Sequence, residues 1–193
     1  MKPTAFEIIT VGVLGLFFTH SPPVGRAADS PCVSGTPVGQ RPGPYSFLVA
    51  TGPQRGQSFC YICDTGERPA AVVFARRLSE PLGKLLLKFD ASAAQPKDAL
   101  RSWMTVLGEK TIGLDDLAKW SKETGLKSVP VGVFDDADGP PSYQLSADAE
   151  VTVLLFVNKK VVANFAFRAG ELNDAAVAKV VEALWKLMDQ KKE

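Results

Sequence analysis

The chain has 193 residues, 46% of them hydrophobic, and its 22 basic and 21 acidic residues give a formal net charge of +1. This charge balance argues against a nucleic-acid partner and against binding to an anionic membrane surface, because both favour a basic protein. The length is sufficient for one domain with a sizeable core.

The N-terminus has the pattern of an export signal. Lys2 precedes an apolar run of eleven residues, Ile8 to Phe18, and Gly25 and Ala27 are small residues suited to positions −3 and −1 of a cleavage site. A membrane-spanning helix needs about 20 apolar residues, so the run is too short for a stable membrane anchor. We predict that residues 1–27 are a signal peptide and that the mature protein is periplasmic or extracellular.

Removal of this signal also removes His20, the only histidine, and leaves 20 basic and 20 acidic residues. A mature chain without histidine cannot form a Ser-His-Asp or Cys-His nucleophile system, nor a histidine-liganded zinc or haem site. A closed zinc site built on its three cysteines would need a carboxylate or a second chain. We therefore expect no metal and no cofactor.

Residues 28–44 are rich in Pro, Gly and Ser and have no apolar period, which predicts a flexible N-terminal arm before a single domain at 45–193. The domain is expected to open with a hairpin, whose strands are Tyr45 to Ala50 and Gln57 to Cys63 on either side of a Gly- and Pro-containing turn.

Helices and short apolar strands alternate through the rest of the chain. Strands are predicted at 70–75, 102–107 and 129–134, and a second hairpin at 151–157 and 161–167. Helices are predicted after the capping residue Ser79, at 114–124 before Gly125, and from about Asn173 onward. In the first helix the apolar residues recur at helical spacing, which predicts one buried face consisting of Leu82, Leu85, Leu86 and Phe89.

This order of elements resembles the thioredoxin fold, in the version found in redoxins and peroxiredoxins. The resemblance covers roughly residues 38–188 and rests on the pattern of elements, with local likeness at Val38-Gly39 and at 151–156. It implies an α/β fold class, with a mixed sheet flanked by helices and an N-terminal hairpin extension. The family places its reactive cysteine after the first core strand, at the start of the following helix.

The sequence departs from the family at two positions of the usual active site. Residues 75–81, which follow the first core strand, contain Arg76 and Arg77 but no cysteine, and Val151 stands where the family has a cis-proline. Peroxidase activity at this position is therefore not expected.

The sequence instead contains a Cys-x-x-Cys motif, Cys60 and Cys63, before the strand at 70–75. This placement puts the pair at the opposite end of the sheet from the usual site. One hypothesis is a relocated redox pair of a thiol-disulfide oxidoreductase, in which Cys60 attacks a protein partner and Cys63 resolves the intermediate. The alternative is a structural disulfide in a non-catalytic binding or scaffold module. Metal-dependent or partner-dependent roles form a third reading.

Cys32, the remaining cysteine, lies in the predicted arm and leaves the number of cysteines odd. It could resolve an intermediate, pair with another chain or remain a free thiol, and the oligomeric state is left open by the sequence.

The signal assignment predicts that exported protein begins at Ala28 or Asp29, because the small residues Gly25 and Ala27 precede the cut. Intact-mass measurement of the exported protein checks this. Recovery of a membrane-retained chain that still begins at Met1 would contradict it.

Overall fold

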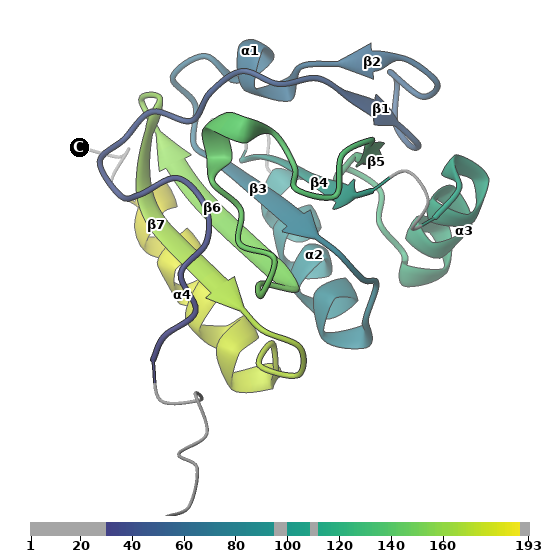
Figure 1. The fold of residues 1–193 in the computed structure, drawn as a ribbon. Coiled ribbons are helices and arrows are strands. Elements are labelled where there is room, and N and C mark those ends of the chain that lie inside the picture. Colours follow the sequence, from purple (N-terminus) through teal and green to yellow (C-terminus); the bar gives the residue numbers. More distant parts are fainter. Residues whose placement is uncertain (1–29, 95–99, 109–111, 190–193) are drawn as a thin grey trace, which may run out of the picture. The chain divides into compact units, whose positions relative to one another are not determined.

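The computed structural model describes residues 30–94, 100–108 and 112–189 (Figure 1). The chain divides into two units, residues 1–31 and 32–193, and the fold belongs to the second. The predicted signal peptide lies outside the described residues. Among the described residues, no helix combines the length and apolar character needed to cross a membrane.

The second unit is built on one mixed sheet of seven strands in the order β2-β1-β5-β4-β3-β6-β7 (Figure 1). Strands β3, β4 and β5 are parallel, while β6 is antiparallel to β3, and β1 is antiparallel to both β2 and β5. The hairpin of β6 and β7 closes the other edge. The strands are β1 Phe47–Val49, β2 Ser58–Phe59, β3 Ala70–Ala75, β4 Arg101–Leu107, β5 Val131–Phe134, β6 Val151–Val157 and β7 Lys160–Phe167.

The described residues of the unit also form these helices: α1 Tyr61–Thr65, α2 Glu80–Ala93, α3 Leu114–Thr124, the short 3-10 helix η2 Pro141–Tyr143 and α4 Asp174–Asp189. Helix α2 begins as predicted, because the Ser79 hydroxyl accepts the Leu82 N–H at its N-terminus. Helix α3 ends as predicted at Gly125, whose φ of 89° is the left-handed conformation that glycine favours.

The two faces of the sheet have different covers. Residues of β3 alternate between the two faces. Ala71, Val73 and Ala75 face a core that α2 and α4 complete. Figure 1 shows both helices on this side of the sheet. Val72 and Phe74 face a second core. Because both sides of β3 are buried, its sequence is a continuous apolar run.

The second core is rich in aromatic residues. The hydroxyl of Tyr45, just before β1, accepts a hydrogen bond from the Trp103 indole N–H at 2.8 Å and also pairs with the Thr105 hydroxyl at 2.9 Å. Burial raises the pKa of Tyr45, which keeps the hydroxyl neutral inside the core. Gly132 in β5 is required here, because a β-carbon at this position would collide with the Phe47 ring and with a neighbouring carbonyl.

The proline- and glycine-rich segment before β1 has no regular secondary structure, yet its described residues are bound to the sheet. The Gly39 N–H donates to the Val161 carbonyl at 2.8 Å, and the Val161 N–H donates to the Gln40 carbonyl at 2.9 Å. Ser34 is buried, and its hydroxyl pairs with that of Thr152 at 2.7 Å. The described part of this segment is therefore held against β6 and β7, whereas its composition predicts a flexible arm. Composition carries no information about such long-range partners.

The first hairpin also differs from the sequence prediction. Its second strand comprises only Ser58–Phe59, and the chain then turns into α1 instead of continuing as a strand to Cys63. The side chains of Tyr61 and Thr65, four residues apart, are both buried, which is helical spacing. Gly66 then ends α1 with a φ of 63°.

The buried face of α2 generates a stability prediction. Replacing Leu86, which is fully buried, with Ala should lower the free energy of unfolding by about 2 to 5 kcal/mol, because it leaves a cavity against the sheet. Leu87→Ala is the matched control, since this neighbour is 40% exposed and should cost much less. Denaturant unfolding of both variants measures the difference, and equal losses would contradict the assigned face.

Candidate functional site

The Cys-x-x-Cys motif is positioned by Tyr61, the residue after Cys60. The Tyr61 ring stacks on Trp103 with ring centroids 5.7 Å apart and meets Phe59 edge-on at 4.7 Å. Burial raises the pKa of the Tyr61 hydroxyl, which donates a hydrogen bond to the Gln54 side-chain oxygen at 3.1 Å. The aromatic core therefore holds α1 through a side chain that lies between the two cysteines.

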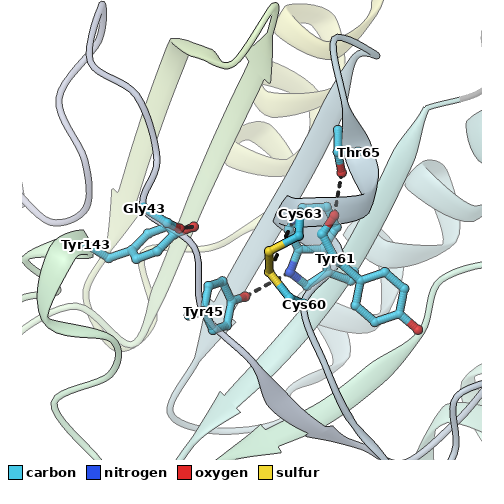
Figure 2. Close-up of a disulfide and its surroundings, with 8 residues drawn as sticks. Gly43, Tyr45, Cys60, Tyr61, Cys63, Thr65 and Tyr143 are labelled. Carbon is cyan, nitrogen blue, oxygen red and sulfur yellow. Dashed lines mark hydrogen bonds between the residues drawn. A yellow bond between two sulfur atoms is a disulfide. The ribbon is translucent and has the colours of Figure 1, made fainter.

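Cys60 and Cys63 form a disulfide at the start of α1, with Cα atoms 5.4 Å apart (Figure 2). Cys60 is the N-cap of the helix, and its sulfur accepts the Cys63 backbone N–H at 3.2 Å. Cys60 is half-buried, whereas Cys63 is exposed. Cys63 is thus the more exposed residue of the pair, which is the reverse of the order implied by the hypothesis that Cys60 attacks.

Ion pairs beside the disulfide fix α1 further. The Asp64 carboxylate pairs with Arg101 of β4 at 2.7 Å and with Arg68 at 3.6 Å. The Thr65 hydroxyl donates to the Tyr61 carbonyl at 2.7 Å. These contacts connect the short helix to the sheet without involving either sulfur atom.

Helix α1 separates two cavities. One, of about 410 Å³, is lined by Tyr61, Asp64 and Arg101 together with the loop before β5, and no cysteine lines it. The other, of about 210 Å³, adjoins the exposed cysteine and is lined by Arg41, Pro42, Pro44, Ile62, Cys63, Gly66, Phe156 and Lys159. Of these two cavities, the smaller one adjoins the disulfide, through Cys63.

Cys32 lies far from this disulfide. The charges that act on its thiol are those of Arg168, Glu171 and Asp148, which follow β7 or precede β6. Cys63 adjoins the opposite end of the same two strands, near Phe156 and Lys159, and a seven-residue strand spans roughly 20 Å. Burial raises the pKa of Cys32, which leaves less of the thiolate that exchange requires. Both facts disfavour Cys32 as a resolving thiol within one chain.

Comparison with solved structures identifies the architecture. A proposed protein disulfide isomerase from Bacteroides thetaiotaomicron matches with a TM-score of 0.59 and 14% sequence identity, over 81% of this chain and 93% of that one. A DsbF homologue from Corynebacterium diphtheriae matches with a TM-score of 0.53 and 12% identity, over 77% and 87%. The chain has a thioredoxin-like fold. The sequence resemblance is therefore confirmed at the level of fold.

A third thioredoxin-like structure, a proposed thiol:disulfide interchange protein DsbE from Chlorobium tepidum, matches with a TM-score of 0.51 and 17% identity, over 77% of this chain and 98% of that one. No protein-family model and no curated protein sequence matches the chain.

At the usual site of this fold, after β3, the structure places Arg76. Its guanidinium donates hydrogen bonds to the carbonyls of Ala149 and Ser146, both at 3.1 Å, and to that of Ala137. Its donors are therefore occupied by the long segment between β5 and β6. The described residues contain no cis peptide bond, so Val151 is trans as predicted from the absence of proline.

The predicted placement of Cys60 and Cys63 relative to the sheet agrees with the structure, because α1 precedes β3 while Arg76 follows it. The motif starts a helix, however, where a strand end was predicted. Sequence reasoning also missed Arg41 and Lys159 beside Cys63. Neither residue belongs to a recognisable motif, and only the tertiary fold brings them together.

The role of Arg76 predicts a local change in stability. In Arg76→Ala, the segment 137–149 loses its charged donor, and the amides of Gly139, Tyr143 and Ala149 should exchange with deuterium about tenfold faster, the effect of one hydrogen bond to a charged group. Arg77→Ala, at an exposed neighbouring position, is the control. Equal exchange rates in the two variants would contradict the role assigned to Arg76.

Proposed function

We propose that the chain is an exported thioredoxin-like protein that exchanges thiols and disulfides with a protein partner through Cys60 and Cys63. The observation that carries the proposal is the disulfide between Cys63, an exposed residue that lines a cavity, and Cys60, whose sulfur accepts a backbone N–H. Export is supported by the signal-like sequence of residues 1–27 and by the presence of a disulfide, which persists in oxidising compartments.

The arrangement suits attack at Cys63. A partner thiolate attacks the Cys63 sulfur, the bond between Cys60 and Cys63 breaks, and its electron pair leaves on the Cys60 sulfur, where the Cys63 N–H stabilises the negative charge. A second partner thiolate then attacks the partner's sulfur in the mixed disulfide and releases Cys63. Two electrons pass to the protein, and the partner becomes a disulfide. The reverse sequence reduces a partner disulfide.

A purely structural role for the disulfide explains less of the geometry around Cys60 and Cys63 than exchange does. The ring closed by the disulfide contains four residues, for which loop entropy predicts a gain of only about 2 kcal/mol. Helix α1 is already held by the Tyr61 ring and by the ion pair of Asp64 with Arg101. The disulfide is therefore not needed to anchor the helix, and its exposed position favours exchange.

The alternative is a non-catalytic binding or scaffold module with a structural disulfide. It is favoured by one observation, the occupation of the usual site by Arg76 and its carbonyl partners. The reduction potential discriminates the two proposals, because structural disulfides lie below about −300 mV and exchanging ones lie higher. A value below this limit would support the alternative.

Single cysteine variants test the exchange mechanism, each in a Cys32→Ser background. Cys60→Ser should form a lasting mixed disulfide with a chromogenic aromatic disulfide, because exposed Cys63 remains and no thiol resolves the product. Cys63→Ser should react about tenfold more slowly, since the remaining Cys60 is half-buried. Stopped-flow absorbance measures both rates.

The chain with both Cys60 and Cys63 replaced by Ser is the control for this experiment and should not react. Faster reaction of Cys63→Ser would assign the attack to Cys60, as the sequence hypothesis had it. If neither single variant reacts faster than a short unstructured peptide containing one cysteine, and the potential lies below −300 mV, the exchange function is excluded.

A further inference from the structure

We infer that the cavity beside Cys63 selects partner cysteines that lie in an acidic, extended segment of a protein. This inference rests on the proposed exchange function and adds the chemistry of the partner. In this arrangement the partner sulfur meets Cys63 while a neighbouring carboxylate lies between Arg41 and Lys159.

The charge of the cavity points to an anionic ligand. Arg41 and Lys159 both line it and no Asp or Glu does. Both are exposed, and within the described part of the chain neither forms an ion pair. Asp64, the acidic residue of α1, pairs with Arg101, and neither Asp64 nor Glu67, which follows the helix, lines the cavity. A carboxylate is therefore the complementary group.

The backbones that carry the two cations are held in place relative to Cys63. Lys159 belongs to the turn between β6 and β7, where Asn158 and Lys159 have φ angles of 50° and 60°. The Asn158 N–H donates to the Glu67 carbonyl at 3.2 Å, which ties this turn to the end of α1. The residue before Arg41, Gln40, accepts the Val161 N–H at 2.9 Å. The backbone at both positive charges is therefore held by hydrogen bonds, and little backbone entropy is lost when a ligand binds.

The size and lining of the cavity indicate a short segment. Its volume of about 210 Å³ is roughly that of seven water molecules, which accommodates a cysteine side chain and part of one neighbouring residue. Pro42, Pro44, Ile62 and Phe156 supply apolar walls for the aliphatic part of such a segment. A cysteine within a folded helix would bring too much bulk, whereas an extended chain presents its side chains singly.

The test compares three capped pentapeptides whose central cysteine is flanked by two aspartates, two asparagines or two lysines. Each reduced peptide is mixed with the oxidised protein at low salt, and the exchange rate is divided by the rate of the same peptide with hydroxyethyl disulfide. This division removes the intrinsic effect of the flanking charges on the peptide thiol. The aspartate peptide should then react about tenfold faster than the lysine peptide, and the ratio should shrink above about 0.1 M salt.

Two pairs of variants locate the source of this preference. In Arg41→Gln with Lys159→Gln the ratio of the aspartate rate to the lysine rate should fall toward one, and in Arg41→Glu with Lys159→Glu it should invert; the asparagine peptide, whose only negative charge is its thiolate, should slow less than the aspartate peptide. The control is Lys88→Gln with Lys179→Gln, which removes the same charge from exposed positions on α2 and α4 and should preserve the ratio.

The outcomes separate this inference from the proposed function. Exchange with all three peptides at one normalised rate would overturn the acidic-partner inference and leave the exchange function standing. A preference that the control pair abolishes equally, or an equal fall for all peptides in the Arg41 and Lys159 variants, would also overturn it. Failure of the oxidised protein to exchange with any peptide would overturn the proposed function and the inference with it.

Discussion

The structure depends on the burial of both faces of β3. All six residues of this interior strand are buried, so the sheet requires a cover on each side. Helices α2 and α4 cover one face with aliphatic side chains. Among the described residues, no long helix covers the other face, and its cover comes from short helices and loops that contribute aromatic residues, among them Tyr45, Tyr61 and Tyr143. Their hydroxyl groups need partners in this core, which explains its buried hydrogen bonds.

This second core also decides where the disulfide lies. The Tyr61 ring packs on Trp103, and this contact holds α1 against the aromatic core. Cys63 becomes exposed, whereas Cys60, at the N-cap, is partly covered. The difference in exposure between the two cysteine residues is consistent with packing by Tyr61, which lies between them in the sequence. The ring contacts of Tyr61 involve neither sulfur atom, which is compatible with opening of the disulfide without loss of these contacts.

The elements that the sequence predicts well have local causes. The buried face of α2 follows from apolar spacing and a serine cap, and the hairpin of β6 and β7 follows from two apolar runs around a polar turn. Helix α1 was missed because five residues are too few for a period to be visible, and because a preceding β-strand favoured an extended reading. Cys60 serving as an N-cap was equally hidden, since cysteine is not a residue that capping patterns favour.

What could not be predicted depends on contacts between distant parts of the chain. The partners of Arg76 are 61 to 73 residues away, and all are backbone carbonyls, which have no sequence signature. The cavity beside Cys63 similarly combines residues of three segments, around Arg41, Ile62 and Lys159. The sequence located the cysteines and the sheet end on which they lie, while their surroundings required the tertiary structure.

The two ends of the sheet now have distinct physical characters. At the carboxyl end of β3, the Arg76 guanidinium donates hydrogen bonds to three backbone carbonyls. These bonds connect β3 to the segment between β5 and β6. At the amino end, Arg41 and Lys159 have no carboxylate partner among the described residues and border an exposed sulfur. A partner that approaches the proposed site would therefore contact the turn of β6 and β7 and the segment before β1, and would not meet the N-terminus of α2. The proposed function thus places recognition on the segment before β1 and on the turn of β6 and β7, at the other end of the sheet from the position where the family has its reactive cysteine.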